Sequence, residues 1–208
     1  MKVFVAIPCL DQMSARFVQC LLDLESPEGV EVIKRLNSGT LVYDSRNSLA
    51  EKAIGSQAEY TFWLDADMTF MPDTLTMMLN TLRQNNLDML VGMYYRRRPP
   101  FTPTLFERLD ISDRIGIRLE EFKKIPDGLF KVGGCGFGCV LMKTDVLMNV
   151  LIKHGAMFSP LNNVGEDLSF CWRARKCGYD IWCDPSIALG HEVHSIITRS
   201  NRSKFTNG

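Results

Sequence analysis

Two aspartates separated by one residue are the first candidates for chemistry in this sequence. In FWLDADMTF, residues 62–70, a run of bulky apolar side chains ends at Asp65 and Asp67. If the chain stays extended there, both carboxylates point the same way, and they repel each other unless a cation lies beside them. Carboxylate oxygens suit Mg²⁺ or Mn²⁺, so the spacing predicts a metal site with positions open for phosphate oxygens. The structural alternative makes Asp65 the cap of the following turn and Asp67 a solvated loop residue.

Further acidic and imidazole groups lie late in the chain. Residues 165–167, GED, begin an expected helix, where the helix dipole favours each acid by about 0.3–1 kcal/mol. That effect alone explains the presence of one of the two acids at this helix start. Residues 189–194, LGHEVH, contain two of the three histidines, and either one alone is more typical of a surface residue than of a metal ligand. The sequence pattern alone therefore does not distinguish a chemical from a structural role for these acids and histidines.

Two arginine-containing stretches are also candidates. Arg46 and Asn47 begin an expected helix; they are either ordinary helix-surface residues or, for Arg46, a guanidinium that binds phosphate oxygens or base carbonyls. Residues 96–100, RRRPP, follow an expected strand. They are either a solvated charge run or a loop from which one arginine meets a diphosphate or an anionic acceptor.

The elements that must position these residues alternate between strands and helices. Hydrophobic patterns predict strands at 2–8, 30–36, 60–64, 88–95 and 179–184, and helices at 15–24, 45–56, 72–86, 144–155 and 166–178. Ser14 is expected to cap the first helix and Gly155 to end the fourth. This order predicts an α/β fold with a mostly parallel sheet flanked by helices. Ligands bind beyond the carboxyl ends of such strands, which places Asp65 and Asp67 in the ligand crevice.

The second half of the chain is less regular. Prolines exclude a regular element at 96–104, and the weak pattern at 108–128 predicts loops or edge strands. The glycines of GGCGFG, residues 133–138, do not have the Rossmann spacing and are interpreted as letting the backbone approach a ligand closely. We expect a single domain over residues 1–195, followed by a polar tail, 196–208, with no clear regular element.

Composition excludes several classes of protein. The 208 residues carry 24 Lys and Arg against 24 Asp and Glu, so no global charge favours nucleic acid or a membrane surface. No apolar run is long enough to span a bilayer, and the start lacks the pattern of a signal peptide. Seven cysteines without a CxxC pair argue against a disulfide framework and a structural zinc site. These features predict a cytoplasmic protein.

Several segments in order resemble the glycosyltransferases of the GT-A fold, and most nearly those of family 2 with its small phage and bacterial members. The segments are VFVAIPCLDQ, SRNSLAEKAIGSQAEYTFWLDADM, GGCGFGCVLMKTDVL and GEDLSFCWRARKCGYDIWCDPSIALGH. The resemblance covers residues 2–194, and the ordered set is more specific than any one piece. It implies a single GT-A-like domain whose irregular second half binds the acceptor.

The resemblance also implies an activity, which is hexosyltransferase-like transfer from a UDP- or GDP-linked sugar to a hydroxyl of a glycan, lipid or other acceptor. Asp67 and His191 would bind Mn²⁺ or Mg²⁺, with Asp65 near the metal or the ribose; His191 is preferred over His194 by its position. The residues implied in donor binding are Pro8, Asp44, Arg46 and Asp65.

On the acceptor side, the resemblance implies that Asp167 is the general base of an inverting transfer. Glu166 would bind the acceptor or orient the loop. One departure concerns the stretch after the second strand, where family 2 members commonly carry paired aspartates. Residues 35–45 here contain Ser38, Gly39, Thr40 and Asp44 but no such pair, which leaves the donor base open.

Two other functions remain possible from the sequence. A nucleotidyltransferase on a similar sheet usually has a glycine-rich, lysine-containing loop after the first strand, and PCLDQMS, residues 8–14, has neither. A non-catalytic nucleotide- or metal-binding protein would keep the acidic crevice without the reaction. The sequence does not indicate an oligomeric state.

Overall fold

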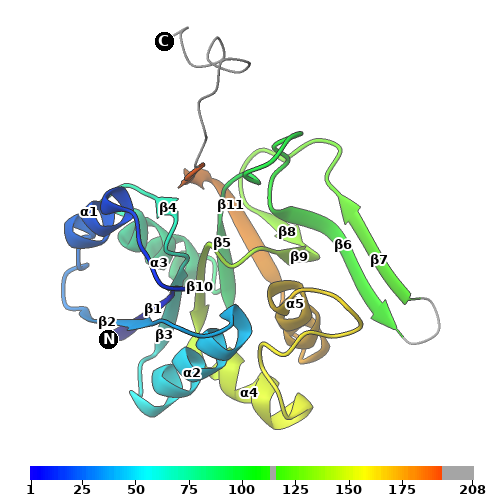
Figure 1. The fold of residues 1–208 in the computed structure, drawn as a ribbon, viewed down its shortest axis with the longest axis horizontal. Coiled ribbons are helices and arrows are strands. Elements are labelled where there is room, and N and C mark those ends of the chain that lie inside the picture. The colour runs from blue at the N-terminus through cyan, green and yellow to red at the C-terminus, as the bar shows by residue number, and fades with distance from the viewer. Residues whose placement is uncertain (113–115, 194–208) are drawn as a thin grey trace, which may run out of the picture.

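The fold is built around one twisted sheet, seen in the computed structural model, which describes residues 1–112 and 116–193 (Figure 1). Within these residues the sheet has seven strands. In spatial order they are β2 (Glu31–Asn37), β1 (Lys2–Pro8), β3 (Tyr60–Leu64), β10 (Cys139–Lys143), β5 (Met89–Met93), β11 (Ile181–Ala188) and β8 (Phe130–Val132).

The sheet is mixed but mostly parallel, as the sequence predicted. Strand β10 runs antiparallel to both β3 and β5, and β8 runs antiparallel to β11, while the other strands share one direction. The carboxyl ends of β1, β3, β5 and β11 therefore meet at one edge of the sheet. That edge is where a ligand crevice is expected in an α/β fold.

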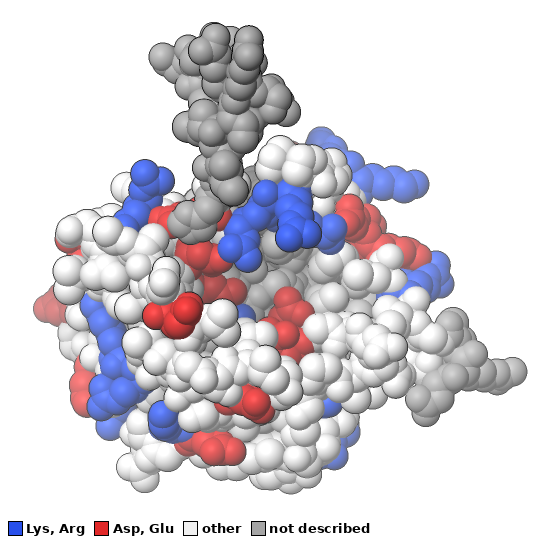
Figure 2. All heavy atoms as spheres, viewed as in Figure 1, with Lys and Arg blue, Asp and Glu red and all other residues white. Residues whose placement is uncertain are grey.

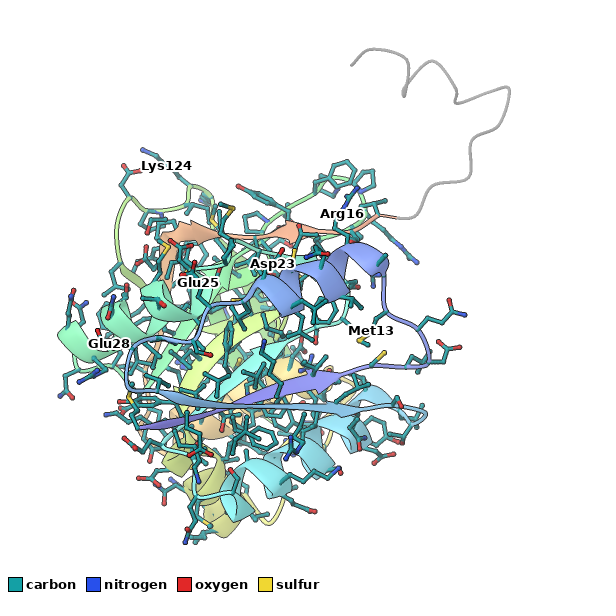
Figure 3. All side chains as sticks on the ribbon, turned by 90° about the vertical axis from the view of Figure 1, so that its left-hand side faces the viewer. Met13, Arg16, Asp23, Glu25, Glu28 and Lys124 are labelled. Carbon is teal, nitrogen blue, oxygen red and sulfur yellow. The ribbon has the colours of Figure 1, made fainter. Side chains whose placement is uncertain are left out.

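Helices cover both faces of the sheet because the central strands β1, β3, β10 and β5 are apolar on both sides. Phe4 and Ala6 of β1 face α2 (Val42–Gly55), α4 (Thr144–His154) and α5 (Glu166–Lys176). Val3 and Val5 face α1 (Ala15–Asp23) and α3 (Thr74–Gln84). Figure 3 looks onto α1, whose labelled Arg16 and Asp23 are exposed.

Helix ends follow the capping signals in the sequence. The hydroxyl of Ser14 accepts a hydrogen bond from the backbone N–H of Phe17 at 2.9 Å, which confirms it as the cap of α1. Gly155 adopts φ 67° directly after α4, in the left-handed region that ends many helices. Helix α2 begins at Val42, earlier than the expected residue 45.

Two smaller sheets complete the second half of the chain. Strands β6 (Leu105–Ser112), β7 (Gly116–Glu121) and β9 (Gly134–Cys135) form one of them, and its β6–β7 hairpin projects at the right of Figure 1. Strands β4 (Met68–Thr69) and β12 (Gly190–His191) form a short antiparallel ribbon. No helix within 1–112 and 116–193 is long and apolar enough to cross a membrane. The expected boundary at 195/196, the tail and His194 lie outside the described residues.

Candidate active site

The β4–β12 ribbon brings together the two residues predicted to bind a metal. After β3 the chain turns, and His191 pairs with Met68 across the ribbon. The backbone N–H of Glu192 donates to the carbonyl of Asp67 at 2.9 Å. As a result, Nε2 of His191 lies 3.4 Å from Oδ2 of Asp67, although the two residues are far apart in the sequence.

The imidazole of His191 is held in one orientation. Its Nδ1 lies 2.8 Å from the carbonyl oxygen of Tyr95, and the ring packs edge-on against Tyr94 at 5.4 Å. Because a carbonyl only accepts, Nδ1 carries a proton. Burial lowers the pKa of His191, but the hydrogen bond to Asp67 and the Tyr95 carbonyl outweigh burial, and the net pKa is raised. Nε2 donates to Asp67 in the protonated ring and offers a lone pair to a cation in the neutral ring. A carbonyl partner of this kind commonly orients metal-binding histidines.

Asp67 is an ionised carboxylate in cationic surroundings. Burial raises its pKa, but the hydrogen bond and charge of His191 and the charge of Arg97 outweigh burial, and the net pKa is lowered. Nη1 of Arg97 lies 2.9 Å from the same Oδ2. Across the described part of the chain, no group of three or more His, Cys, Asp and Glu residues gathers to hold a metal. An imidazole nitrogen beside a carboxylate nevertheless fits a divalent cation that takes its other ligands from water and phosphate oxygens.

Asp65 pairs with Arg46. Nη2 of Arg46 donates to Oδ1 of Asp65 at 2.7 Å, and Nε donates to Oε1 of Glu166 at 3.2 Å. Burial raises the pKa of Asp65, and the charge of Arg46 opposes this without reversing it. The two aspartates of the D-x-D pair therefore have different partners, one on each side of the site.

Asp167 lies in the first turn of α5, next to Glu166. Burial raises its pKa to about 6, and the charge of Glu166 adds to the rise. The backbone N–H of Leu168 donates to its Oδ1 at 2.7 Å, which opposes the rise and fixes the carboxylate. A carboxylate with a pKa near the working pH suits proton transfer.

A cavity of about 440 Å³ opens at the carboxyl ends of the strands. It is lined by Pro8, Cys9, Leu10, Gln12, Met13, Ser14, Thr40, Val42, Asp65, Ala66, Asp67, Arg97 and Glu192. Figure 2 shows acidic side chains along the hollow in this face and basic side chains overhanging it. The lining thus includes Pro8 and both aspartates of the D-x-D pair. Asp44 and Arg46 lie outside this lining, and Asp44 is exposed in the first turn of α2.

Two of the GGCGFG glycines, Gly136 and Gly138, lie against Tyr94, and the expected close approach of a ligand to this segment stays a prediction. A Cβ on Gly136 would lie 2.3 Å from the hydroxyl oxygen of Tyr94, and one on Gly138 would lie 2.7 Å from its Cζ. The N–H of Gly138 donates to that hydroxyl at 2.9 Å. These glycines make room for Tyr94, which in turn packs against His191.

Some site residues were not predicted individually. Of the three arginines in RRRPP, Arg97 reaches the site, while Arg96 pairs with Glu121 at 2.9 Å; nothing in the run distinguishes one from another. Glu192 lines the cavity and accepts a hydrogen bond from the hydroxyl of Ser14 at 2.7 Å. Its position directly after His191 is the one signal that could have found it.

The topology and the acidic mouth of the sheet define a GT-A-like α/β domain. Residues 11–151, more than half of the 208, match the sequence model of "Glycosyl transferase family 2". The chain therefore belongs to glycosyltransferase family 2. The matched range ends before Glu166, Asp167 and His191, so their roles depend on geometry.

Solved structures share the fold at low sequence identity. One is described as "Crystal Structure of A197 from STIV", with a TM-score of 0.60, 16% identity, and 95% of this chain and 98% of that chain covered. Another is "Crystal structure of GalNAc-T7 with UDP, GalNAc and Mn2+", with a TM-score of 0.61, 10% identity, and 94% of this chain and 44% of that chain covered. At these identities the likeness concerns the fold alone.

Proposed function

We propose that this protein transfers a sugar from a UDP- or GDP-linked donor to a hydroxyl acceptor, in a metal-dependent reaction that inverts the anomeric centre. The observation that carries the proposal is the 3.4 Å approach of His191 Nε2 to Asp67 Oδ2 at the mouth of the cavity. Family membership supports the reaction class. The GalNAc-T7 structure, described with UDP and Mn²⁺, supports the choice of donor and cofactor class.

On the donor side, Asp67 and His191 would hold Mn²⁺ or Mg²⁺. When bound, such a cation supplies positive charge next to the departing nucleoside diphosphate. Arg97 lies at the same carboxylate and is half exposed, at 51%, so its guanidinium is available to phosphate oxygens. Asp65 and Pro8 line the cavity that would receive the nucleoside and its ribose, and Asp44 lies farther out on α2.

On the acceptor side, Asp167 would act as the base. Its carboxylate takes the proton from the acceptor hydroxyl while that oxygen attacks the anomeric carbon. The bond from the anomeric carbon to the diphosphate oxygen breaks at the same time, and the electron pair leaves with the nucleoside diphosphate. Attack opposite the leaving group gives inversion. Glu166, one residue earlier, would bind the acceptor or orient the loop.

The test is a binding and turnover screen on the full chain. UDP, GDP and CMP are titrated by calorimetry with and without Mn²⁺ or Mg²⁺, and the matching nucleotide-sugars are assayed for release of nucleotide. The proposal expects one nucleotide to bind only with metal, and its sugar conjugate to be turned over. Binding that is independent of metal, or no binding at all, contradicts it. Release of pyrophosphate from a nucleoside triphosphate and a sugar phosphate would instead identify a nucleotidyltransferase.

A further inference from the structure

Arg46 connects the donor half of the site to the acceptor half. Its Nη2 binds Asp65, which follows β3, and its Nε binds Glu166, which begins α5. We propose that Arg46 is a positioning residue: it fixes the acids of α5 relative to the donor-side carboxylates, and it does not bind the nucleotide. This inference rests on the proposed function and differs from the nucleotide contact that the sequence predicted for Arg46.

The first support is the burial of Arg46, whose exposure is 2%. The guanidinium carbon lies 5.7, 5.4 and 6.0 Å from the ring centroids of Trp63, Phe137 and Phe158, close enough for cation–π attraction. These rings come from different parts of the chain and hold the guanidinium beneath the cavity. A side chain packed in this way is suited to holding other groups in place, because its own rotamers are restricted.

The second support is the balance of charge around Arg46. Its guanidinium lies 2.7 Å from Asp65 and 3.2 Å from Glu166, and the charge of Asp167 also acts on it. The same charge of Arg46 opposes the upward shift in the pKa of Asp167. Without the guanidinium, three carboxylates would repel one another in partly buried positions, and the first turn of α5 would move outward.

The third support is the geometry of the two hydrogen bonds. Nη2 and Nε are different nitrogens of one rigid plane, and each binds a different carboxylate. The plane therefore sets the separation of Asp65 and Glu166. Lysine keeps the positive charge but presents a single nitrogen, so it preserves the charge balance and loses the fixed separation. Arg46→Lys and Arg46→Gln thus separate geometry from charge.

The experiment compares these two variants with Arg173→Gln, which removes another buried arginine. Arg173 is 4% exposed and donates to the carbonyls of Met157 and Ser159 at 3.0 and 2.7 Å, so it controls for general loss of packing. UDP and GDP affinity with Mn²⁺ is measured by calorimetry, and transfer is measured at saturating donor. Because displacement by about 1 Å can cost about 100-fold in rate, Arg46→Lys should lose about 100-fold in transfer and keep nucleotide affinity within about threefold.

Two outcomes would overturn the inference. One is a tenfold or greater loss of UDP or GDP affinity with transfer at saturating donor unchanged, which would make Arg46 a nucleotide ligand. The other is a transfer rate in folded Arg46→Lys no lower than in Arg173→Gln, which would leave Arg46 a purely structural residue. Circular dichroism first checks that each variant keeps its secondary structure. If Arg46→Gln does not fold, the comparison is made with Arg46→Lys alone.

A separate measurement distinguishes failure of the inference from failure of the proposed function. If the unmodified protein binds neither UDP nor GDP, the proposed function fails, yet the carboxyl carbon of Asp167 can still be titrated by NMR in the ligand-free chain. The inference expects Arg46→Gln to raise the Asp167 midpoint and Arg173→Gln to leave it in place. An unchanged midpoint in Arg46→Gln contradicts it.

Discussion

Asp67 and Asp167 are carboxylates of one site in opposite surroundings. Asp67 lies beside His191 and Arg97, and its pKa is lowered. Asp167 lies beside Glu166, is desolvated, and has its pKa raised to about 6. Surroundings that separate the pKa values of two acids divide their roles. Under the proposed function, Asp67 provides a permanent negative charge suited to a cation on the donor side, and Asp167 provides a group that exchanges a proton on the acceptor side.

Removing the proton acceptor has the largest expected effect. Asp167→Asn should reduce transfer by about 10²–10⁴-fold, because an amide does not take the proton of the attacking hydroxyl. Donor affinity should stay within a few-fold, since Asp167 lies outside the lining of the cavity. Steady-state kinetics and calorimetry with the donor found in the screen measure both. Equal loss of transfer and affinity would refute its role as the base.

Removing the permanent charge has the next largest effect. Asp67→Asn should weaken metal-dependent UDP or GDP binding by about 100-fold or more, because a neutral amide is a poor ligand for a hard cation. Calorimetry with Mn²⁺ measures the change. Asp73→Asn is the matched control, since Asp73 is exposed and makes no capping bond at α3. Comparable losses in both variants would remove Asp67 from the cation site.

The pH dependence of transfer should follow Asp167. With its pKa at about 6, the carboxylate is the required form, so the rate should fall about tenfold per pH unit below that value and level off above it. The midpoint is measured from transfer at saturating donor across pH 5–8. The residual rate of Asp167→Asn should lack this acidic limb. A rate that does not fall toward pH 5 would contradict a base with this raised pKa.

The same shift predicts a smaller effect on stability. The pKa of Asp167 rises on folding from 3.8 to about 6, so the native state binds more protons than the unfolded state between these values, and stability falls as pH rises through them. Asp167→Asn should therefore stabilise the fold at pH 8 by about 1–2 kcal/mol, after allowance for partial exposure. Thermal denaturation should show this gap in stability between Asp167→Asn and the unmodified protein closing toward pH 4. A gap independent of pH would contradict the linkage.

The last effects concern only the packing around Tyr94, which contacts His191. Gly136→Ala places a Cβ 2.3 Å from the Tyr94 hydroxyl and should destabilise the fold by about 1–3 kcal/mol. Gly55→Ala, in α2 with nothing within 4 Å of its Cβ, should stabilise it by about 0.4–1 kcal/mol. Chemical denaturation compares the two. Similar changes in both variants would mean that Tyr94 is not tightly held.

The sequence predicted the elements whose patterns are local. Strands β1, β3 and β5 are apolar on both faces, and Ser14 and Gly155 carry their capping signals in their own residue types. The insertion of β10 between β3 and β5 is a matter of long-range pairing, which no local pattern encodes. The β6–β7 hairpin was predicted only as loops or edge strands, because its exposed strand β7 has weak alternation.

The same distinction between local patterns and long-range contacts applies to the candidate site. The D-x-D position follows from a buried strand ending at a crevice, and the approach of His191 to Asp67 agrees with the geometry that the family resemblance implied. The contacts of Arg46 could not be read from the sequence, because its carboxylate partners and the three rings around it come from distant segments. Roles assigned to single residues remain predictions until the variants are measured.

The β4–β12 ribbon affects the order in which the sheet and the candidate site are completed. Strands β1, β3, β5 and β10 are all synthesised before Gly190, so most of the sheet can assemble while the imidazole of His191 is still missing. A polypeptide cut ahead of β12 would keep the larger part of its core and lack His191, one of the two residues proposed to bind a cation. Assembly of the sheet and completion of the candidate site are thus separable, and the second depends on a pairing of only two residues on each strand.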